Sequence, residues 1–332
     1  MTVQTESLLA VTDLRVEVGQ DAARTEIVHD ISLSVPRGGA LAIVGESGSG
    51  KTLTALSMIG LLPPGVHASQ GLVDFDGRDL LQLGDVDWQG VRGRDIAMIF
   101  QDPTSALNPC LTVGYQIAEM FRRHQGMARG QAYTQAVDLM TQVGIPDAAR
   151  RVTAYPHQFS GGMRQRIMIA MALALGPRLL IADEPTTALD VTVQAQILRL
   201  LKQRRADDEL ALILITHDLG VVARVAESVA VMYAGRIVEH GPVPEVYSRP
   251  AHPYTRGLIG TVPTRTGGRS QLASIEGQPP DPASPPDGCA FHPRCPLAQP
   301  ICRTERPPLR PLTDGRSSAC HFAEDVLGGA DD

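Results

Sequence analysis

A short apolar run at 40–44 that leads directly into a glycine-rich loop places the strongest constraint on the fold of this chain. The run is typical of a strand buried on both faces, and the loop matches the pattern G-x-x-x-x-G-K-[ST]. Its three glycines let successive backbone N–H groups point inward around phosphate oxygens, and the following helix adds partial positive charge at its N-terminus. The predicted phosphate-binding loop consists of Gly45, Glu46, Ser47, Gly48, Ser49, Gly50, Lys51 and Thr52.

A second apolar run, at 179–182, ends in two carboxylates, Asp183 and Glu184. In the predicted phosphate-binding loop at 45–52, we expect Lys51 to reach the β- and γ-phosphates and Thr52 to ligate Mg²⁺. Asp183, at the C-terminal edge of the sheet, can hold the hydration shell of the magnesium ion. Glu184 can orient and deprotonate the attacking water. The two segments together predict an ATPase that uses Mg²⁺.

The remaining hydrophobic pattern alternates between strands and helices. Apolar runs at 96–100, 210–216 and 229–233 indicate further buried strands, and alternating apolar and polar residues at 8–18 and 27–35 indicate half-exposed ones. This alternation predicts an α/β fold with a mainly parallel sheet. Apolar residues three and four apart predict helices between the strands, at 113–123, 131–143, 162–174 and 193–204.

Composition narrows the classes of protein and of partner. With 43% hydrophobic and 20% charged residues, the 332-residue chain is predicted to be globular, and its net charge of -6 makes nucleic acid an unexpected partner. The longest apolar run, at 167–175, is shorter than the roughly 18 residues that suggest a membrane span. Residues 1–9 lack a basic region followed by an apolar stretch, so we expect a cytoplasmic protein without a signal peptide.

Three further motifs, in order along the chain, connect it with a known family. Gln101 follows one predicted strand, the sequence FSGGMRQR begins at Phe159, and Thr-His-Asp at 216–218 follows another strand. Together with the phosphate loop and Asp183-Glu184, this set resembles the nucleotide-binding subunit of an ATP-binding cassette (ABC) transporter. The resemblance implies a P-loop NTPase fold of the ABC ATPase type, with a RecA-like core, an antiparallel β-subdomain and an inserted helical subdomain at about 102–168.

The resemblance also implies roles for individual residues. Glu184, His217 and Gln101 would be catalytic, and Gln101 would join Thr52 and Asp183 at the magnesium ion. Val18 stands where an aromatic ring often stacks on adenine, so adenine would pack on aliphatic side chains. The family pairs two ATPase subunits head to tail, so that ATP held by one is closed by the signature motif of the other. The signature residues here would be Ser160, Gly161, Gly162 and Met163, and Asp190 would belong to the D-loop.

The C-terminal part of the sequence has a different composition. Six prolines at 262–288 indicate a linker, so we place a boundary between a nucleotide-binding domain at 1–262 and a linker with a Cys-rich domain at 263–332. Because disulfides are disfavoured in the cytosol, the spacing of Cys289, Cys295, Cys302 and Cys320 suggests a metal site or unliganded thiols. Some ATPase subunits of peptide importers carry a [4Fe-4S] cluster on a similar set, so the resemblance implies such a cluster. The alternative is Zn²⁺, held by all four cysteines or by three of them with His292 or His321.

Residues 249–255 and the Cys-rich region look like the C-terminal extension of ATPase subunits in dipeptide and oligopeptide importers, which nickel importers largely share. The resemblance implies a peripheral protein at the cytoplasmic face of the membrane. Its partners would be two transmembrane permease subunits, a second ATPase (a copy or a paralogue) and a solute-binding protein outside the cytoplasm. A nickel or other small-solute importer is the alternative. A soluble ABC ATPase acting on DNA or ribosomes is disfavoured, because Lys51 and Ser160 lie in one short cassette.

Overall fold

The computed structural model describes residues 7–19, 24–186, 190–261, 275–281, 283–312 and 315–328. The chain divides into two compact units, which we describe one at a time. The helical unit comprises Met1–Leu8, Pro36–Gly39 and Leu83–Ile213, and the loop unit comprises Leu9–Val35, Ala40–Gln82 and Leu214–Asp332. The division falls within the strand β8 (Ala211–Ile215).

An antiparallel sheet forms the first part of the loop unit. Its strand order is β2 (Thr25–Pro36), β1 (Ser7–Val18), β4 (Val66–Phe75) and β5 (Arg78–Asp79). Buried and exposed residues alternate along β2, as period-two apolar patterning requires of a strand with one face on a core. The half-exposed strands predicted at 8–18 and 27–35 are therefore confirmed as β1 and β2.

The second part of the loop unit contains the strand that leads into the glycine-rich loop. This strand, β3 (Ala40–Val44), is buried throughout and pairs in parallel with β9 (Ser228–Tyr233). The neighbouring strand β10 (Arg236–Pro242) runs antiparallel to β9, and the short strands β12 (Ser317–Ser318) and β11 (Arg310–Pro311) follow it at the edge. The C-terminal region thus adds two strands to the same sheet, which the sequence did not predict.

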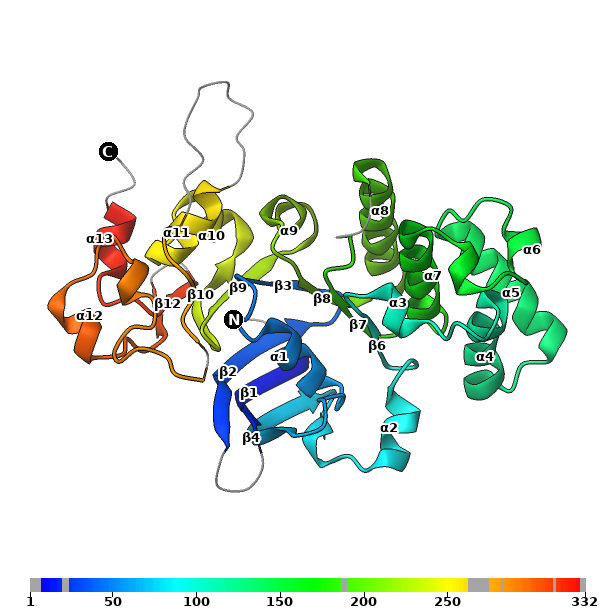
Figure 1. The fold of residues 1–332 in the computed structure, drawn as a ribbon, viewed down its shortest axis with the longest axis horizontal. Helices are drawn as coiled ribbons and strands as arrows, with labels where there is room; N and C mark the ends of the chain where they lie inside the picture. The colour runs from blue at the N-terminus through cyan, green and yellow to red at the C-terminus, as the bar shows by residue number, and fades with distance from the viewer. Residues whose placement is uncertain are drawn as a thin grey trace, which may run out of the picture. The chain divides into compact units, whose positions relative to one another are not determined.

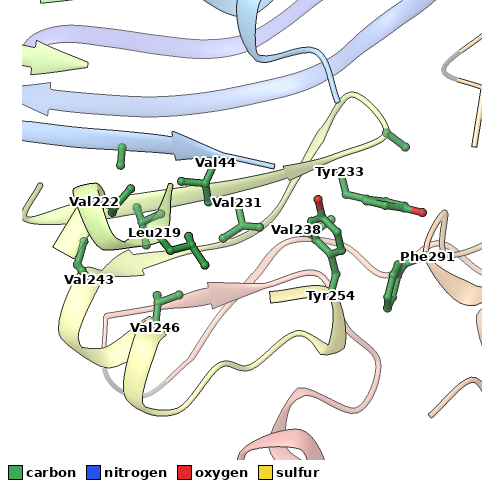
Figure 2. Packing of buried hydrophobic residues seen from close by; sticks show 13 residues of the cluster. Val44, Leu219, Val222, Val231, Tyr233, Val238, Val243, Val246, Tyr254 and Phe291 are labelled. Carbon is green, nitrogen blue, oxygen red and sulfur yellow. The ribbon is translucent and has the colours of Figure 1, made fainter. Parts of the chain in front are cut away.

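One hydrophobic cluster joins these strands to helices and to the C-terminal region. Figure 2 shows Val44 and Val231 from neighbouring strands, with Val222 from α9 (Leu219–Val225) beside them. At the other end of the cluster lie the rings of Tyr233, Tyr254 and Phe291, of which Phe291 is only 2% exposed. Burial of such a ring stabilises the fold by about 1.5–3 kcal/mol, so the C-terminal region shares the core of this unit.

The helical unit combines a pair of parallel strands with a group of helices. The strands β6 (Ile96–Ile99) and β7 (Leu179–Asp183) pair from Ile96 opposite Leu179. Four helices contact one another and lie together in Figure 1, in green. They are α4 (Val113–Gln125), α5 (Arg129–Gln142), α6 (Ala148–Arg151) and α7 (Gly161–Leu173).

The ends of α4 show how the sequence sets the helix boundaries. The Thr112 hydroxyl caps the N-terminus by accepting the N–H of Tyr115 at 3.3 Å, and Gly126 ends the helix at φ +65°. Arg122 and Arg123 in the last turn complement the negative end of the helix dipole. The expected helix at 113–123 is therefore confirmed and is slightly longer.

The remaining elements are short, apart from α8 (Val191–Asp208) in the helical unit. That unit also contains α2 (Asp85–Val91), α3 (Pro103–Ala106) and the 3₁₀ turn η3 (Pro156–Gln158). The loop unit contains α1 (Lys51–Met58), η2 (Leu80–Gln82), α10 (Val243–Ser248), α11 (Pro253–Gly260), η4 (His292–Arg294), α12 (Pro300–Thr304) and α13 (Ala323–Gly328).

The α/β fold predicted from the sequence is confirmed. All seven predicted strands and all four predicted helices are present, with ends shifted by at most a few residues. Among the described residues, every helix is too short or too polar to cross a lipid bilayer.

We predict opposite effects for two glycine-to-alanine changes in the helical unit. A methyl group at Gly114, in α4, would overlap the side chain and carbonyl of Val152, whereas one at Gly130, in α5, meets nothing within 4 Å. Gly114→Ala should therefore destabilise the protein by about 1–3 kcal/mol. Gly130→Ala should stabilise it by about 0.5–1 kcal/mol, because alanine loses less backbone entropy in a helix. Thermal unfolding of both variants checks the pair, and equal effects would contradict the packing at Gly114.

Candidate functional site

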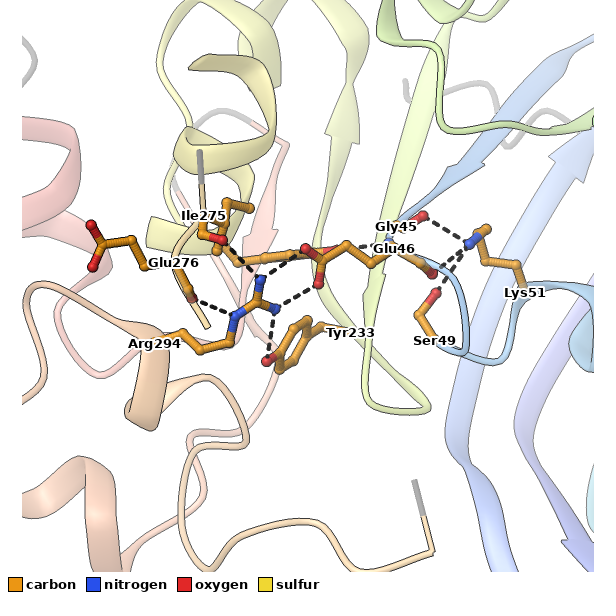
Figure 3. Close-up of polar contacts among 9 residues, drawn as sticks. Gly45, Glu46, Ser49, Lys51, Tyr233, Ile275, Glu276 and Arg294 are labelled. Carbon is orange, nitrogen blue, oxygen red and sulfur yellow. Dashed lines mark hydrogen bonds and ion pairs between the residues drawn. The ribbon is translucent and has the colours of Figure 1, made fainter. Parts of the chain in front are cut away.

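The glycine-rich loop is curled around the ammonium group of Lys51. Nζ donates hydrogen bonds to the carbonyl oxygens of Gly45 and Glu46, both at 2.8 Å, and to the hydroxyl of Ser49 at 3.3 Å (Figure 3). Gly48 and Gly50 have φ of +79° and +97°, a region that favours glycine. A Cβ at Gly45 would overlap the carbonyl oxygen of Met232 in β9. The loop therefore needs its glycines both for backbone conformation and for close packing.

The second residue of this loop, Glu46, is bound by the C-terminal region. Its carboxylate forms a two-point ion pair with Arg294, at 2.6 and 2.9 Å (Figure 3). The Arg294 side chain is 5% exposed and that of Glu46 is 25% exposed. The hydrogen bonds to Glu46 raise the pKa of Arg294 above its already high value, so the guanidinium stays charged. Sequence reasoning placed Glu46 in the loop but gave no role to Arg294.

A tyrosine supports the same position of the loop from α11. The Glu46 backbone N–H donates to the Tyr254 hydroxyl at 2.8 Å. The Tyr254 ring is fully buried, with its centre 4.6 Å from that of Tyr233 and 5.4 Å from that of Phe291. Burial raises the pKa of Tyr254, which keeps the hydroxyl neutral. The signal that could have identified Tyr254 was its place in the segment 249–255, which the sequence had already singled out.

A buried carboxyl group fixes the residues just before Tyr254. Glu239, in β10, accepts the backbone N–H groups of Ala251 at 2.8 Å and His252 at 3.0 Å. The Nδ1 atom of His252 in turn accepts the N–H of Tyr254 at 3.1 Å. Because Glu239 is fully buried, its pKa is raised to about 7 despite these hydrogen bonds. A chain of polar contacts therefore runs from Glu239 to the loop at 45–52.

Two other predicted site residues lie in the loop unit. His217 is exposed and directly follows Thr216, whose N–H donates to the carbonyl of Ile43 in β3 at 3.2 Å. His217 therefore leaves the sheet beside β3, the strand that leads into the loop at 45–52. Asp218 caps α9 immediately after His217.

Val18, where adenine was expected to pack, lies at the end of β1, opposite Val66, and is 38% exposed. Thr52, Ser47 and Gly48 of the loop are exposed as well.

The helical unit brings two of the predicted catalytic residues together. The side-chain amide of Gln101 donates to Oε2 of Glu184 at 3.2 Å. The contact arises because Gln101 follows β6 and Glu184 follows β7, and adjacent parallel strands end at the same edge of a sheet. Asp183, the last residue of β7, is 2% exposed, and Glu184 has a φ of +48°. Gln165 supports the turn by donating to the carbonyl of Pro185 at 3.0 Å.

The predicted signature residues begin α7. Ser160 is the N-cap and accepts the N–H of Met163 at 3.4 Å, and Gly161 and Gly162 form the first turn. Ser160 and Gly161 are exposed, which leaves the first turn open to an anion. Asp190 caps α8 by accepting the N–H of Val193 at 2.9 Å. Residues 188 and 189, directly before Asp190, lie outside the described residues.

The predicted metal centre in the C-terminal region requires a correction. Cys289, Cys295, Cys302 and Cys320 line one small cavity together with His292 and His321. Among the described residues, however, no group of three or more His, Cys, Asp or Glu side chains could hold a metal ion. The [4Fe-4S] prediction and its zinc alternative are therefore wrong, and the cysteines are free thiols.

Comparisons with known proteins cover most of the chain. Residues 28–187 match the family model described as ABC transporter, and residues 238–302 match the oligopeptide/dipeptide transporter C-terminal region. The chain is 48% identical to the dipeptide transport ATP-binding protein DppD of Escherichia coli (strain K12), over 97% of this chain and 98% of that protein. It is 47% identical to the oligopeptide transport ATP-binding protein OppD of Bacillus subtilis (strain 168), over 94% and 88%.

A solved structure resembles it as well. The ATP-binding cassette MJ0796, in a dimeric post-hydrolysis state bound to ADP and Pi, has a TM-score of 0.64 with 25% identity. The match covers 71% of this chain and 98% of that one.

The raised pKa of Glu239 predicts a pH dependence of stability. The folded carboxyl releases its proton near pH 7 and the unfolded one near its ordinary 4.5, so the folded state binds more protons between these values. The contribution of Glu239 to stability should therefore fall as pH rises through this window, by on the order of 3 kcal/mol. The buried His252, whose pKa burial lowers to about 3, contributes in the opposite direction, so the contribution of Glu239 is measured as a difference. Urea unfolding of the parent and of Glu239→Gln at pH 5 and pH 7.5 gives it, and the variant should lack this fall.

Glu324 provides the matched control, because Arg310 lowers its pKa to about 2, outside the window. Glu324→Gln should leave the slope between pH 5 and pH 7.5 as in the parent. If Glu239→Gln kept the parent slope, the assignment to Glu239 would be wrong.

Proposed function

The chain belongs to the family of ABC transporter ATP-binding subunits, and from this membership we propose that it powers the import of dipeptides or oligopeptides through separate membrane subunits. As a member of this family it is an ATP-hydrolysing subunit. The observation that carries the peptide assignment is the 48% identity to a dipeptide transport ATP-binding protein over nearly the full length of both chains. The match of residues 238–302 to the oligopeptide/dipeptide transporter C-terminal region supports the same cargo class.

The residues of the loop at 45–52 fit a nucleoside triphosphate with Mg²⁺. Its glycines hold the backbone in an open curl, and the Lys51 ammonium already lies inside it, bound by the loop's own oxygens. Lys51 would exchange these bonds for β- and γ-phosphate oxygens. Thr52, Asp183 and Gln101 would hold Mg²⁺. When bound, this ion neutralises negative charge on the phosphates. Val18 would pack on the adenine.

Glu184 is the proposed general base. Its carboxylate accepts a hydrogen bond from Gln101, which orients it while leaving it ionised to take a proton from water. His217 would contact the γ-phosphate and help align that water. Ser160, Gly161, Gly162 and Met163 would close the nucleotide held by a second ATPase subunit, and Asp190 would belong to the same subunit contact.

The remaining parts of the proposal concern domains and partners. The helical subdomain at about 102–168 would dock on two permease subunits, with a second ATPase and a solute-binding protein completing the complex. The chain would then lie at the cytoplasmic face of the membrane as a peripheral subunit. The proposed boundary at 262–263, between the ATPase domain and the Cys-rich extension at 263–332, lies outside the described residues.

We predict that Glu184→Gln separates ATP binding from hydrolysis. The amide cannot accept the proton of the attacking water, so phosphate release should fall by roughly 10²–10⁴-fold while ATP binding is retained. Both quantities are measured on one preparation, by phosphate release and by titration with a fluorescent ATP analogue. Asp207→Asn, an exposed carboxylate in α8, is the control and should behave as the parent. Hydrolysis by Glu184→Gln at the parent rate would exclude Glu184 as the base.

The transport assignment is tested by purification from native membranes. Mild-detergent affinity purification of the tagged chain, followed by mass spectrometry, should recover two multi-span membrane proteins and a second ATPase subunit. Uptake of labelled dipeptides should then be lost in cells that carry only the Glu184→Gln chain. Recovery of the chain alone or with ribosomes, or undiminished peptide uptake, would contradict the proposal.

A further inference from the structure

Arg294 joins the C-terminal region to the loop at 45–52 by more contacts than a surface ion pair makes. Its two terminal nitrogens contact both carboxylate oxygens of Glu46. Its Nε donates to the carbonyl of Glu276 at 3.0 Å, and one terminal nitrogen also donates to that of Ile275 at 3.3 Å (Figure 3). The other terminal nitrogen lies 3.4 Å from the Tyr233 hydroxyl. All three guanidinium nitrogens are therefore held.

Burial distinguishes this pair from a second Arg–Glu pair in the same region. Arg294 is 5% exposed, whereas Arg310 and its partner Glu324 are 34% and 64% exposed. Exposed pairs contribute little to stability, but removal of one partner of a buried pair leaves an uncompensated charge. The planar guanidinium also fixes the direction of the carboxylate, because both oxygens are bound at once.

Glu46 is held through each of its polar groups. Its carbonyl oxygen accepts Lys51 Nζ, its N–H donates to the Tyr254 hydroxyl, and its carboxylate is bound by Arg294. The lysine contact belongs to the loop itself, but the other two come from residues after 250. The backbone and side chain of this loop position are thus set by the C-terminal part of the loop unit.

The negative charge of Glu46 would weaken the binding of an anion to the loop. A loop that wraps phosphates gains affinity from its inward N–H groups and from Lys51, and a carboxylate in the same loop opposes that gain. Arg294 neutralises the charge of the Glu46 carboxylate by binding both of its oxygens. Without Arg294, the carboxylate would remain in the loop with its charge uncompensated and its direction unfixed.

We propose that Arg294 is a positioning residue of the nucleotide site, which acts through Glu46 to hold the loop in its phosphate-binding form and to neutralise the Glu46 carboxylate. ATP affinity then depends on the C-terminal region, although no residue of that region needs to touch the nucleotide. The inference rests on the proposed role of the loop at 45–52 in binding ATP.

The test is a double-mutant cycle on ATP affinity in the full-length chain. Arg294→Gln should weaken binding of a fluorescent ATP analogue by about tenfold or more, because it leaves the Glu46 charge uncompensated. Glu46→Gln should change affinity by less, because Arg294 keeps the carbonyls of Glu276 and Ile275 as partners and its positive charge does not oppose a triphosphate. The double variant should bind more tightly than Arg294→Gln alone. A role limited to folding the C-terminal region would not produce this recovery.

Two further variants separate the possible outcomes. Arg310→Gln removes the exposed pair in the same region and should leave ATP affinity as in the parent. Lys51→Ala should abolish binding; if it does not, the proposed function of the loop fails. If Lys51→Ala abolishes binding while Arg294→Gln binds as the parent does, only the inference about Arg294 is overturned. A double variant that binds no better than Arg294→Gln would also overturn it.

Discussion

The buried ammonium of Lys51 is the constraint on which the loop unit depends. A positive charge removed from water must be compensated by hydrogen bonds, and here the carbonyls of Gly45 and Glu46 supply them. This turns the loop back on itself, so Gly45 packs against the carbonyl of Met232 in β9. The turn between β9 and β10 also supports the loop, because the N–H of Gly235 donates to the carbonyl of Ser49 at 3.1 Å. The loop at 45–52 is thus supported by the β9–β10 hairpin as well as by β3, the strand that leads into it.

The aromatic cluster extends this support to the C-terminal region. Tyr233 follows directly from the strand that braces Gly45, and it packs against Tyr254 and Phe291 with ring centres 4.6 and 5.3 Å away. Phe291 lies two residues after Cys289 and three before Arg294. The hydrophobic contact of Phe291 therefore fixes the segment from which Arg294 reaches Glu46. Packing and the ion pair act on one short stretch of chain, so both hold the C-terminal region against the rest of the loop unit.

The sequence predicted the parts of the structure that depend on local pattern. Buried strands such as β3 and β7 read as continuous apolar runs. The resemblance gave catalytic roles to Gln101 and Glu184, but their contact was not predicted and is explained by the parallel strands that end at one edge. The sequence analysis missed β4, because its residues are mostly exposed or half-buried and show no clear alternation of buried and exposed positions. It also missed Arg294, because a pair 248 residues apart leaves no local signal. The cysteine spacing misled for a related reason, since spacing along the chain does not specify how buried thiols are arranged in space.

The identity of residue 46 decides how far the loop depends on the rest of its unit. In the proposed nucleotide site, a neutral side chain at this position would leave Lys51 to attract phosphate without opposition. With glutamate, the same loop carries a charge that must be matched, and the matching group comes from a residue far along the chain. The backbone N–H of Glu46 is likewise satisfied by Tyr254, which Glu239 holds in place through the segment before it. Since each of these partners lies in β10 or beyond it, the hydrogen bonds and the charge that hold Glu46 depend on the C-terminal part of the unit as well as on the loop's own sequence.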